Sequence, residues 1–185
     1  AATVAGGNYN RASGLFSTIV GGRDGSATNY GATVAGGEEN MAAGYYSTVG
    51  GGETNTASNY AATVAGGLDN QATGDSSVVC GGLYNLVSHD ASTVGGGYDN
   101  KAISDYATVA GGESNTAEAY AATVSGGYAH WVLGEYGVIA GGNFNTANAY
   151  ASTVVGGEYQ DASGKISTIV GGGYHTATGY GAVVG

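Results

Sequence analysis

The sequence contains no proline, one cysteine and only four basic residues among its 185 residues. The missing proline excludes collagen and polyproline structures, and a single cysteine, Cys80, allows no intrachain disulfide. Fourteen acidic residues give a net charge of −10, and phosphate binding needs clustered Lys and Arg, so we expect no nucleic-acid partner. Since no apolar run reaches the roughly 18 residues of a membrane-spanning helix, we expect no membrane insertion by this segment.

Glycine, by contrast, is abundant and regularly placed. A Gly-Gly pair recurs twelve times, from Gly6-Gly7 to Gly171-Gly172, always 15 residues after the previous pair. A fixed short period is typical of a solenoid, in which each repeat forms one coil stacked on the last. We number the repeat so that the pair occupies positions 6 and 7, and we call the same position in successive coils a column.

The other columns predict where the strands lie. Column 4 is Val or Ile in all thirteen instances, column 3 is Thr in ten of them, and column 2 is always small. This pattern predicts a strand over columns 1 to 5, turned by the Gly pair. Column 10 is Asn in eight of twelve coils and column 12 is Ala in ten, which predicts an Asn ladder, a weaker strand over columns 10 to 13, and a second corner near column 14.

We therefore predict an all-β fold: a parallel β-solenoid of about twelve 15-residue coils, forming a single repeat domain over residues 1–185 with columns 2, 4 and 12 inside. Twelve of the fourteen acidic residues fall in columns 8, 9 and 15, whereas columns 1, 3 and 5 carry no charge. Side chains alternate along a strand, so columns 1, 3 and 5 are expected to point outward. A strand without charge on either face is typical of one buried on both sides, which predicts a partner on this face.

The sequence offers no catalytic constellation, so we predict neither an enzyme nor a cofactor or metal site. His89, His130 and His175 are spread over distant coils or different columns, and His130 and His175 merely replace Asn in column 10. Cys80 occupies a column of small residues and is expected to be a packed, unreactive thiol.

The aromatic residues indicate a candidate binding site. All fifteen Tyr fall in columns 8, 9, 15 and 1, where rings are expected to shield the corners. The pattern is broken most clearly at Tyr128, His130 and Trp131, the last being the only tryptophan and a binding candidate if exposed. Burial of Trp131 against a sister chain or a neighbouring domain is the alternative. A weaker break, with Tyr84 and His89, lies three coils earlier and is expected on the same side.

The repeat itself resembles a known pattern. The unit Ala57-Ser58-Asn59-Tyr60-Ala61-Ala62-Thr63-Val64-Ala65-Gly66-Gly67, followed by x-x-Asn-x-Ala, resembles the head repeats of trimeric autotransporter adhesins of the YadA type. It is equally similar to repeats in tail-fibre-like proteins that end in a self-cleaving chaperone domain. The resemblance implies a left-handed β-roll assembled as a parallel homotrimer. It further implies an extracellular location, on a cell, virion or fibre surface, and attachment to a protein or glycan of a host or neighbouring cell.

The 15-residue unit with its Gly pair is longer than the typical adhesin unit. Because the chain starts and stops within a repeat, we expect a segment of a longer fibre.

Two functions from different classes follow. The first is an adhesive, structural fibre segment whose columns 3 and 5 meet at a threefold axis, with interface residues Thr93, Thr108, Thr123, Val138, Ala110 and Ser125. The second is an ice-binding solenoid that uses the regular Thr column, consisting of Thr3, Thr18, Thr33, Thr48, Thr63, Thr93, Thr108, Thr123, Thr153 and Thr168.

Overall fold

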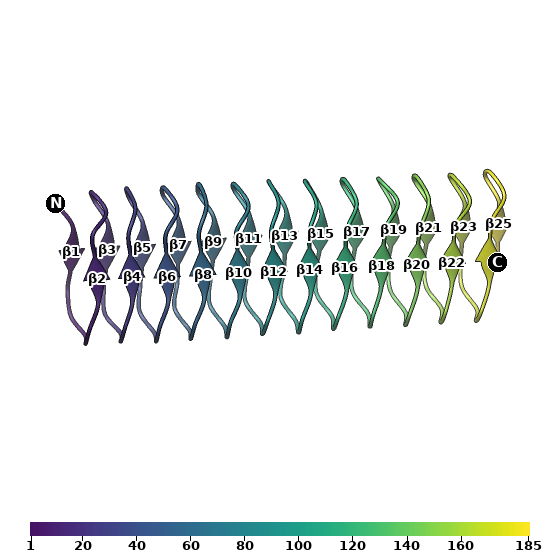
Figure 1. The fold of residues 1–185 in the computed structure, drawn as a ribbon. Coiled ribbons are helices and arrows are strands. Elements are labelled where there is room, and N and C mark those ends of the chain that lie inside the picture. Colours follow the sequence, from purple (N-terminus) through teal and green to yellow (C-terminus); the bar gives the residue numbers. More distant parts are fainter. The chain divides into compact units, whose positions relative to one another are not determined.

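Each 15-residue coil contributes two strands of two residues to the computed structural model, which describes the whole chain, Ala1–Gly185. The fold is all-β, without any helix, and forms a parallel β-solenoid of about twelve coils (Figure 1). The solenoid is thus confirmed. Internal contacts divide the chain into two units, Ala1–Ala91 and Ser92–Gly185, and each is described by itself. The single repeat domain over residues 1–185 stays a prediction.

In each unit the odd-numbered strands form one parallel sheet and the even-numbered strands another. In the first unit the odd strands are β1 (Thr3–Val4), β3 (Thr18–Ile19), β5 (Thr33–Val34), β7 (Thr48–Val49), β9 (Thr63–Val64) and β11 (Val78–Val79). Its even strands are β2 (Arg11–Ala12), β4 (Ser26–Ala27), β6 (Met41–Ala42), β8 (Thr56–Ala57), β10 (Gln71–Ala72) and β12 (Leu86–Val87). In the second unit the odd strands are β13 (Thr93–Val94), β15 (Thr108–Val109), β17 (Thr123–Val124), β19 (Val138–Ile139), β21 (Thr153–Val154), β23 (Thr168–Ile169) and β25 (Val183–Val184). Its even strands are β14 (Lys101–Ala102), β16 (Thr116–Ala117), β18 (Trp131–Val132), β20 (Thr146–Ala147), β22 (Asp161–Ala162) and β24 (Thr176–Ala177).

Strands pair in register with the same column of the next coil. Thr33 lies opposite Thr48, and Val34 lies opposite Val49. The strands are shorter than the sequence predicts, covering columns 3–4 and 11–12 instead of 1–5 and 10–13. Column 8 adds an isolated parallel bridge between neighbouring coils, as from Asn8 to Arg23. Pairing is therefore distributed around the coil in short stretches separated by corners.

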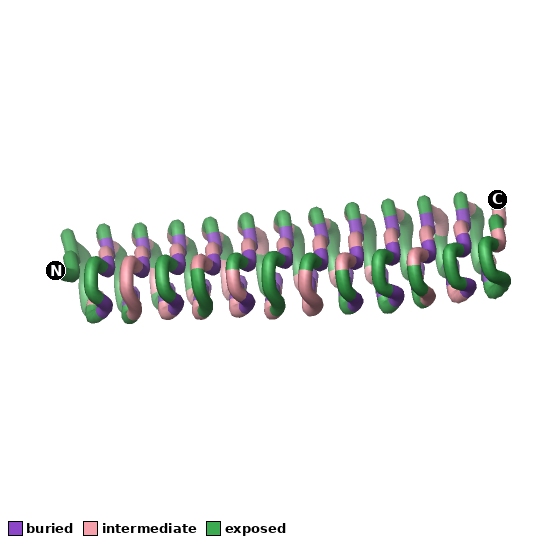
Figure 2. The backbone as a smooth tube through the Cα atoms, turned by 90° about the horizontal axis from the view of Figure 1, so that it is seen from above, coloured by how far each residue is buried: buried purple, intermediate pink, exposed green.

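The interior is formed by the predicted columns. Ala62 and Val64, from columns 2 and 4, and Ala57, from column 12, are completely buried. Thr63 in column 3 is half-buried and Ala65 in column 5 is exposed, as side-chain alternation requires. Buried, half-buried and exposed residues recur at the same places in successive coils (Figure 2). Most coils thus contribute only one Val or Ile and two small residues to a thin core; Val87 and Val132 are the larger exceptions in column 12.

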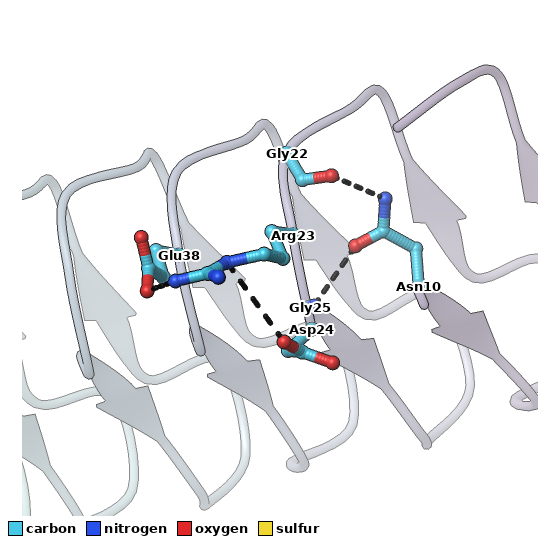
Figure 3. Close-up of polar contacts among 6 residues, drawn as sticks. All are labelled: Asn10, Gly22, Arg23, Asp24, Gly25 and Glu38. Atoms are coloured by element: carbon cyan, nitrogen blue, oxygen red, sulfur yellow. Dashed lines mark hydrogen bonds and ion pairs between the residues drawn. The ribbon is translucent and has the colours of Figure 1, made fainter. Parts of the chain in front are cut away.

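The Asn column forms a ladder between side chains and the backbone. Asn10 Nδ2 donates to the carbonyl oxygen of Gly22, and Asn10 Oδ1 accepts from the amide of Gly25, both at 2.9 Å (Figure 3). On the surface beside this corner, Arg23 forms an ion pair with Glu38 of the next coil. Each interior Asn therefore joins its own coil to the next, which confirms the predicted ladder.

The corners depend on left-handed backbone, which an L-residue other than glycine rarely adopts. In the pair Gly36-Gly37, only Gly37 needs glycine: its φ is +85°, and a Cβ there would lie 2.1 Å from the carbonyl oxygen of Gly52. A Cβ on Gly36 would meet no atom within 4 Å. The residues of columns 1 and 9 also have a left-handed backbone, although most of them are not glycine; examples are Tyr46 at φ 56° and Glu39 at φ 54°.

Hydrogen bonds to the previous coil hold these left-handed residues. The amide of Tyr46 donates to the carbonyl of Tyr30 at 2.8 Å, and the amide of Glu39 donates to the carbonyl of Arg23 at 2.9 Å. The prediction that column 1 continues the strand is therefore wrong, because this residue turns the chain. The predicted corner does lie near column 14, but glycine serves a different purpose there: a Cβ on Gly44 would lie 1.8 Å from the carbonyl oxygen of Asn59.

Candidate binding surfaces

Trp131 lies on the outer face of the even-strand sheet in the second unit. It opens β18, and its side chain is 56% exposed, whereas the next residue, Val132, is completely buried. Leu133 returns to the outer side and is 44% exposed, and Tyr128 at the preceding corner is 40% exposed. In the single chain these three residues, the tryptophan patch, expose apolar surface, and Trp131 is the largest residue of column 11.

The tryptophan side chain alters its neighbour. Thr116 lies directly beside Trp131 in the adjacent strand and is only 9% exposed, although Thr56, in the same column of the first unit, is half-buried. Thr116 is therefore buried although side-chain alternation places column 11 on the outside of the coil. We attribute the burial to the indole, which is large enough to cover the neighbouring threonine.

His130 does not belong to the exposed surface. Its side chain is completely buried, its amide donates to Asn115 Oδ1 at 3.0 Å, and its Nδ1 accepts from the amide of Asn145 at 3.1 Å. Because Nδ1 accepts, the ring proton belongs on Nε2. Desolvation, the main cause, lowers the pKa of His130 despite opposing contributions from the backbone of Gly142 and Asn145. The reading of His130 as a ladder residue is confirmed, and its inclusion among surface-binding residues is corrected.

The weaker break lies in the first unit. Tyr84 is 45% exposed in a left-handed corner at φ 59°, and His89 is exposed with its Nδ1 3.0 Å from the hydroxyl of Ser88. Leu83 adds a side chain that is 42% exposed. Tyr84 and His89 belong to different corners of their coil, so they do not form one compact site.

The predicted interface residues lie together on the outer face of the odd-strand sheet of the second unit. Thr93, Thr108, Thr123 and Val138 follow one another in register, and all are half-buried. Ala110 and Ser125, from column 5, are exposed. We call columns 3 and 5 the uncharged face. In the first unit Cys80 lies in column 5 and is exposed, so the expectation of a packed thiol is wrong for the single chain.

A feature that we did not predict is an aromatic row along the corner formed by columns 15 and 1. In the second unit the ring of Tyr120 lies between those of Tyr106 and Tyr136, with ring centres 5.4 and 5.6 Å away and interplanar angles of 71° and 73°. Tyr150 continues the row beyond Tyr136 at 5.6 Å and 70°. Along this row the aromatic residue comes alternately from column 1, as in Tyr106 and Tyr136, and from column 15, as in Tyr120 and Tyr150.

The signal for this row is present in the sequence as a second period of two coils. Column 1 alternates between large residues, such as Tyr106 and Tyr136, and small ones, such as Ala121 and Ala151. The first unit shows the physical reason: a Cβ on Gly31, also in column 1, would lie 2.7 Å from Cδ1 of Tyr46 in the next coil. A small residue at alternate corners therefore leaves room for the neighbouring ring.

The structure contains no pocket and no group of three His, Cys, Asp or Glu side chains placed to hold a metal ion. No helix capable of crossing a lipid bilayer is present. All candidate sites are therefore open surfaces on the outside of the coils. No protein family and no curated protein sequence matches this chain.

Proposed function

We propose that the chain is a structural, adhesive segment of an extracellular fibre, assembled as a parallel homotrimer of left-handed solenoids. The observation that carries this proposal is the uncharged face. In the second unit, column 5 exposes Val155 and Val170, 48% and 52% accessible, beside a half-buried Thr column without any charge. Water-exposed apolar rows of this kind are typical of interaction surfaces.

The thin interior gives a second reason for assembly. Most coils bury one Val or Ile and two small residues, and small cores leave a chain with little stability of its own. Covering the uncharged face would extend the buried apolar area along every coil. The acidic columns 8, 9 and 15 would remain in water, where their like charges are screened.

Attachment to a protein or glycan on a host or neighbouring cell would then involve the outward corners and the even-strand face. The tryptophan patch is the candidate contact, because exposed tryptophan is enriched at the energetic centre of interfaces. In a trimer the patch occurs three times, so weak individual contacts gain from multivalency.

The alternative of ice binding has one observation in its favour. The Thr column is held in register, with Thr93, Thr108 and Thr123 in adjacent strands about 4.8 Å apart. Column 5 beside it is apolar rather than a second Thr column, and large side chains such as Tyr106 stand at the adjoining corner. The trimer therefore accounts for more of this face, and a stable monomer would favour ice binding.

Matched charge substitutions test the assembly. Thr93→Lys introduces a charge on the uncharged face, where three copies would meet in a trimer without partners, so we expect this variant to be monomeric. Thr146→Lys is the control, because Thr146 is also a half-buried threonine that opens a strand of the second unit, but on the even-strand sheet next to Asp161. Size-exclusion chromatography with light scattering measures both. Equal loss of assembly in the two variants would contradict the assigned face.

Cys80 supplies a native reporter of parallel packing. In a parallel trimer the three exposed thiols would converge at one level, so a short three-armed maleimide should yield a covalent species of three chains. Moving the thiol to the even-strand face, with Cys80→Ala and Gln71→Cys, should abolish this product. Equal cross-linking of the two proteins would indicate random collision instead.

A further inference from the structure

The aromatic row of the second unit forms a charged as well as an apolar surface. We call Tyr106, Tyr120, Tyr136 and Tyr150 the tyrosine stripe; their side chains are 56%, 40%, 47% and 45% exposed. Asp105 directly precedes Tyr106 and Glu135 directly precedes Tyr136. These carboxylates act on the rings: the pKa of Tyr120 is raised, first by desolvation, then by Tyr136 and Tyr106, and also by Asp105 and Glu135.

The stacking geometry leaves ring faces open. Neighbouring rings in the stripe meet at interplanar angles of 70–73°, with the edge of one ring against the face of the next. In each such contact, the ring that presents its edge has neither of its faces covered by that neighbour. At the opposite corner of the same unit, Tyr159 is sandwiched between Phe144 at 4.8 Å and 4° and Tyr174 at 5.0 Å and 14°. Both faces of Tyr159 are therefore covered by other rings.

The chain itself shows which group fits beside the stripe. At the corner after Tyr150, column 15 holds Lys165, whose Nζ lies 4.9 Å from the centre of the Tyr150 ring. The ammonium group thus extends the row of rings, in the geometry of a cation–π contact. A cation is complementary both to the ring faces and to the neighbouring carboxylates.

We propose that the tyrosine stripe, with Asp105 and Glu135, is a docking surface for a Lys- or Arg-rich segment of another polypeptide. Arginine is the better ligand, because its planar guanidinium stacks on aromatic rings while donating to carboxylates. The net charge of −10 attracts such a segment before contact. We favour a basic segment over a neutral glycan because Lys165 already places a cation against the Tyr150 ring at the end of this row. This inference does not depend on the tryptophan patch, which lies on a different face of the coils.

The probe is a fluorescent 12-residue peptide of alternating Arg and Ser, and the control peptide carries citrulline, the neutral analogue of arginine, in place of every Arg. Fluorescence anisotropy with the full 185-residue chain should show saturable binding of the Arg peptide, weakened by salt, and none of the citrulline peptide. Equal binding of the two peptides would overturn the proposal. So would a stripe that binds a neutral β-linked oligosaccharide but not the Arg peptide, since this result would assign the surface to glycans.

Matched substitutions locate the site. Tyr120→Leu and Tyr150→Leu should each raise the Kd of the Arg peptide about threefold to fivefold, the range expected for an exposed cation–π contact. Leucine is compatible with this column because Leu15 occupies it in the first unit. Tyr159→Leu is the control, since Tyr159 is 43% exposed and also follows a glutamate, but both its faces are covered. An equal effect of Tyr159→Leu would show that binding is not specific to the tyrosine stripe and would overturn the proposal.

A gain-of-affinity variant keeps the proposal testable if the leucine variants fold poorly. Lys165→Gln removes the internal cation from Tyr150, so the Arg peptide should bind more tightly. Lys101→Gln removes the same charge from a lysine that lies 3.2 Å from Asp99, away from the stripe, and corrects for net charge alone. The proposal requires a larger gain from Lys165→Gln. Equal gains would contradict it.

Discussion

Replacing Asn55 by alanine should show how strongly the Asn ladder holds neighbouring coils together. Asn55 is completely buried, and its Nδ2 donates to the carbonyls of Gly51 at 2.9 Å and Gly67 at 2.8 Å. Its Oδ1 accepts from the amide of Asn70 at 2.9 Å. Alanine would remove all three bonds at once.

The expected loss follows from which backbone groups are left without a partner. The carbonyl of Gly67 also accepts from the amide of Glu53, so it keeps one hydrogen bond. The carbonyl of Gly51 and the amide of Asn70 lose the side-chain bond that satisfies them. At about 1–3 kcal/mol for each unsatisfied buried group, Asn55→Ala should lower the free energy of unfolding by about 2–6 kcal/mol.

Urea unfolding followed by circular dichroism measures this loss. The control is Asn59→Ala in the same coil, because Asn59 is exposed and its Oδ1 accepts only from the adjacent amide of Tyr60, at 3.1 Å. We expect the control to change stability by no more than about 0.5 kcal/mol. If Asn55→Ala were as mild as Asn59→Ala, the ladder would not be a stabilising element and the reasoning would be refuted.

Three further predictions concern single positions. Gly37→Ala should lower the free energy of unfolding, measured in urea, by more than about 2 kcal/mol, because Gly37 has a φ of +85° and the new Cβ would lie 2.1 Å from a carbonyl oxygen. The control, Gly36→Ala, should change it by no more than about 0.5 kcal/mol. Equal effects would contradict the assigned corner. Burial lowers the pKa of His130 in the folded chain below its ordinary value of 6.5. As pH falls through 6.5, only the unfolded chain therefore takes up this proton, and the free energy of unfolding decreases. The decrease ends once the pH is below the pKa of the folded chain, where both states are protonated. His130→Asn should remove that part of the pH dependence, and identical pH profiles for the two proteins would refute the buried neutral histidine. Trp131→Ala should leave the melting temperature nearly unchanged but abolish attachment to cells; a large fall in melting temperature with attachment intact would instead indicate packing against a sister chain.

The parts of the fold that sequence predicted correctly are those fixed by alternation and period. Val64 recurs as Val or Ile in every coil, and side-chain alternation places it inside, so its burial could be predicted directly. Asn55 could be placed in a ladder for the same reason. Charge placement likewise identified the corners, because a carboxylate is rarely buried in a thin apolar core.

The errors concern backbone conformation and contacts between coils. Nothing in the residue type of Tyr46 or Glu39 predicts a left-handed conformation; hydrogen bonds from the previous coil impose it. Thr116 is buried by the unusual residue next to it, which its own column does not reveal. The tyrosine stripe was missed because its period is two coils, and a 15-residue alignment averages large and small residues of column 1 together.

The most direct test of the proposed assembly is the molar mass of the 185-residue chain in solution, measured by light scattering at micromolar concentration. A parallel homotrimer that covers the uncharged face predicts a mass three times the 18.0 kDa of one chain, unchanged on moderate dilution. A stable monomer of 18.0 kDa, with its Thr column exposed to water, would contradict the proposed fibre segment.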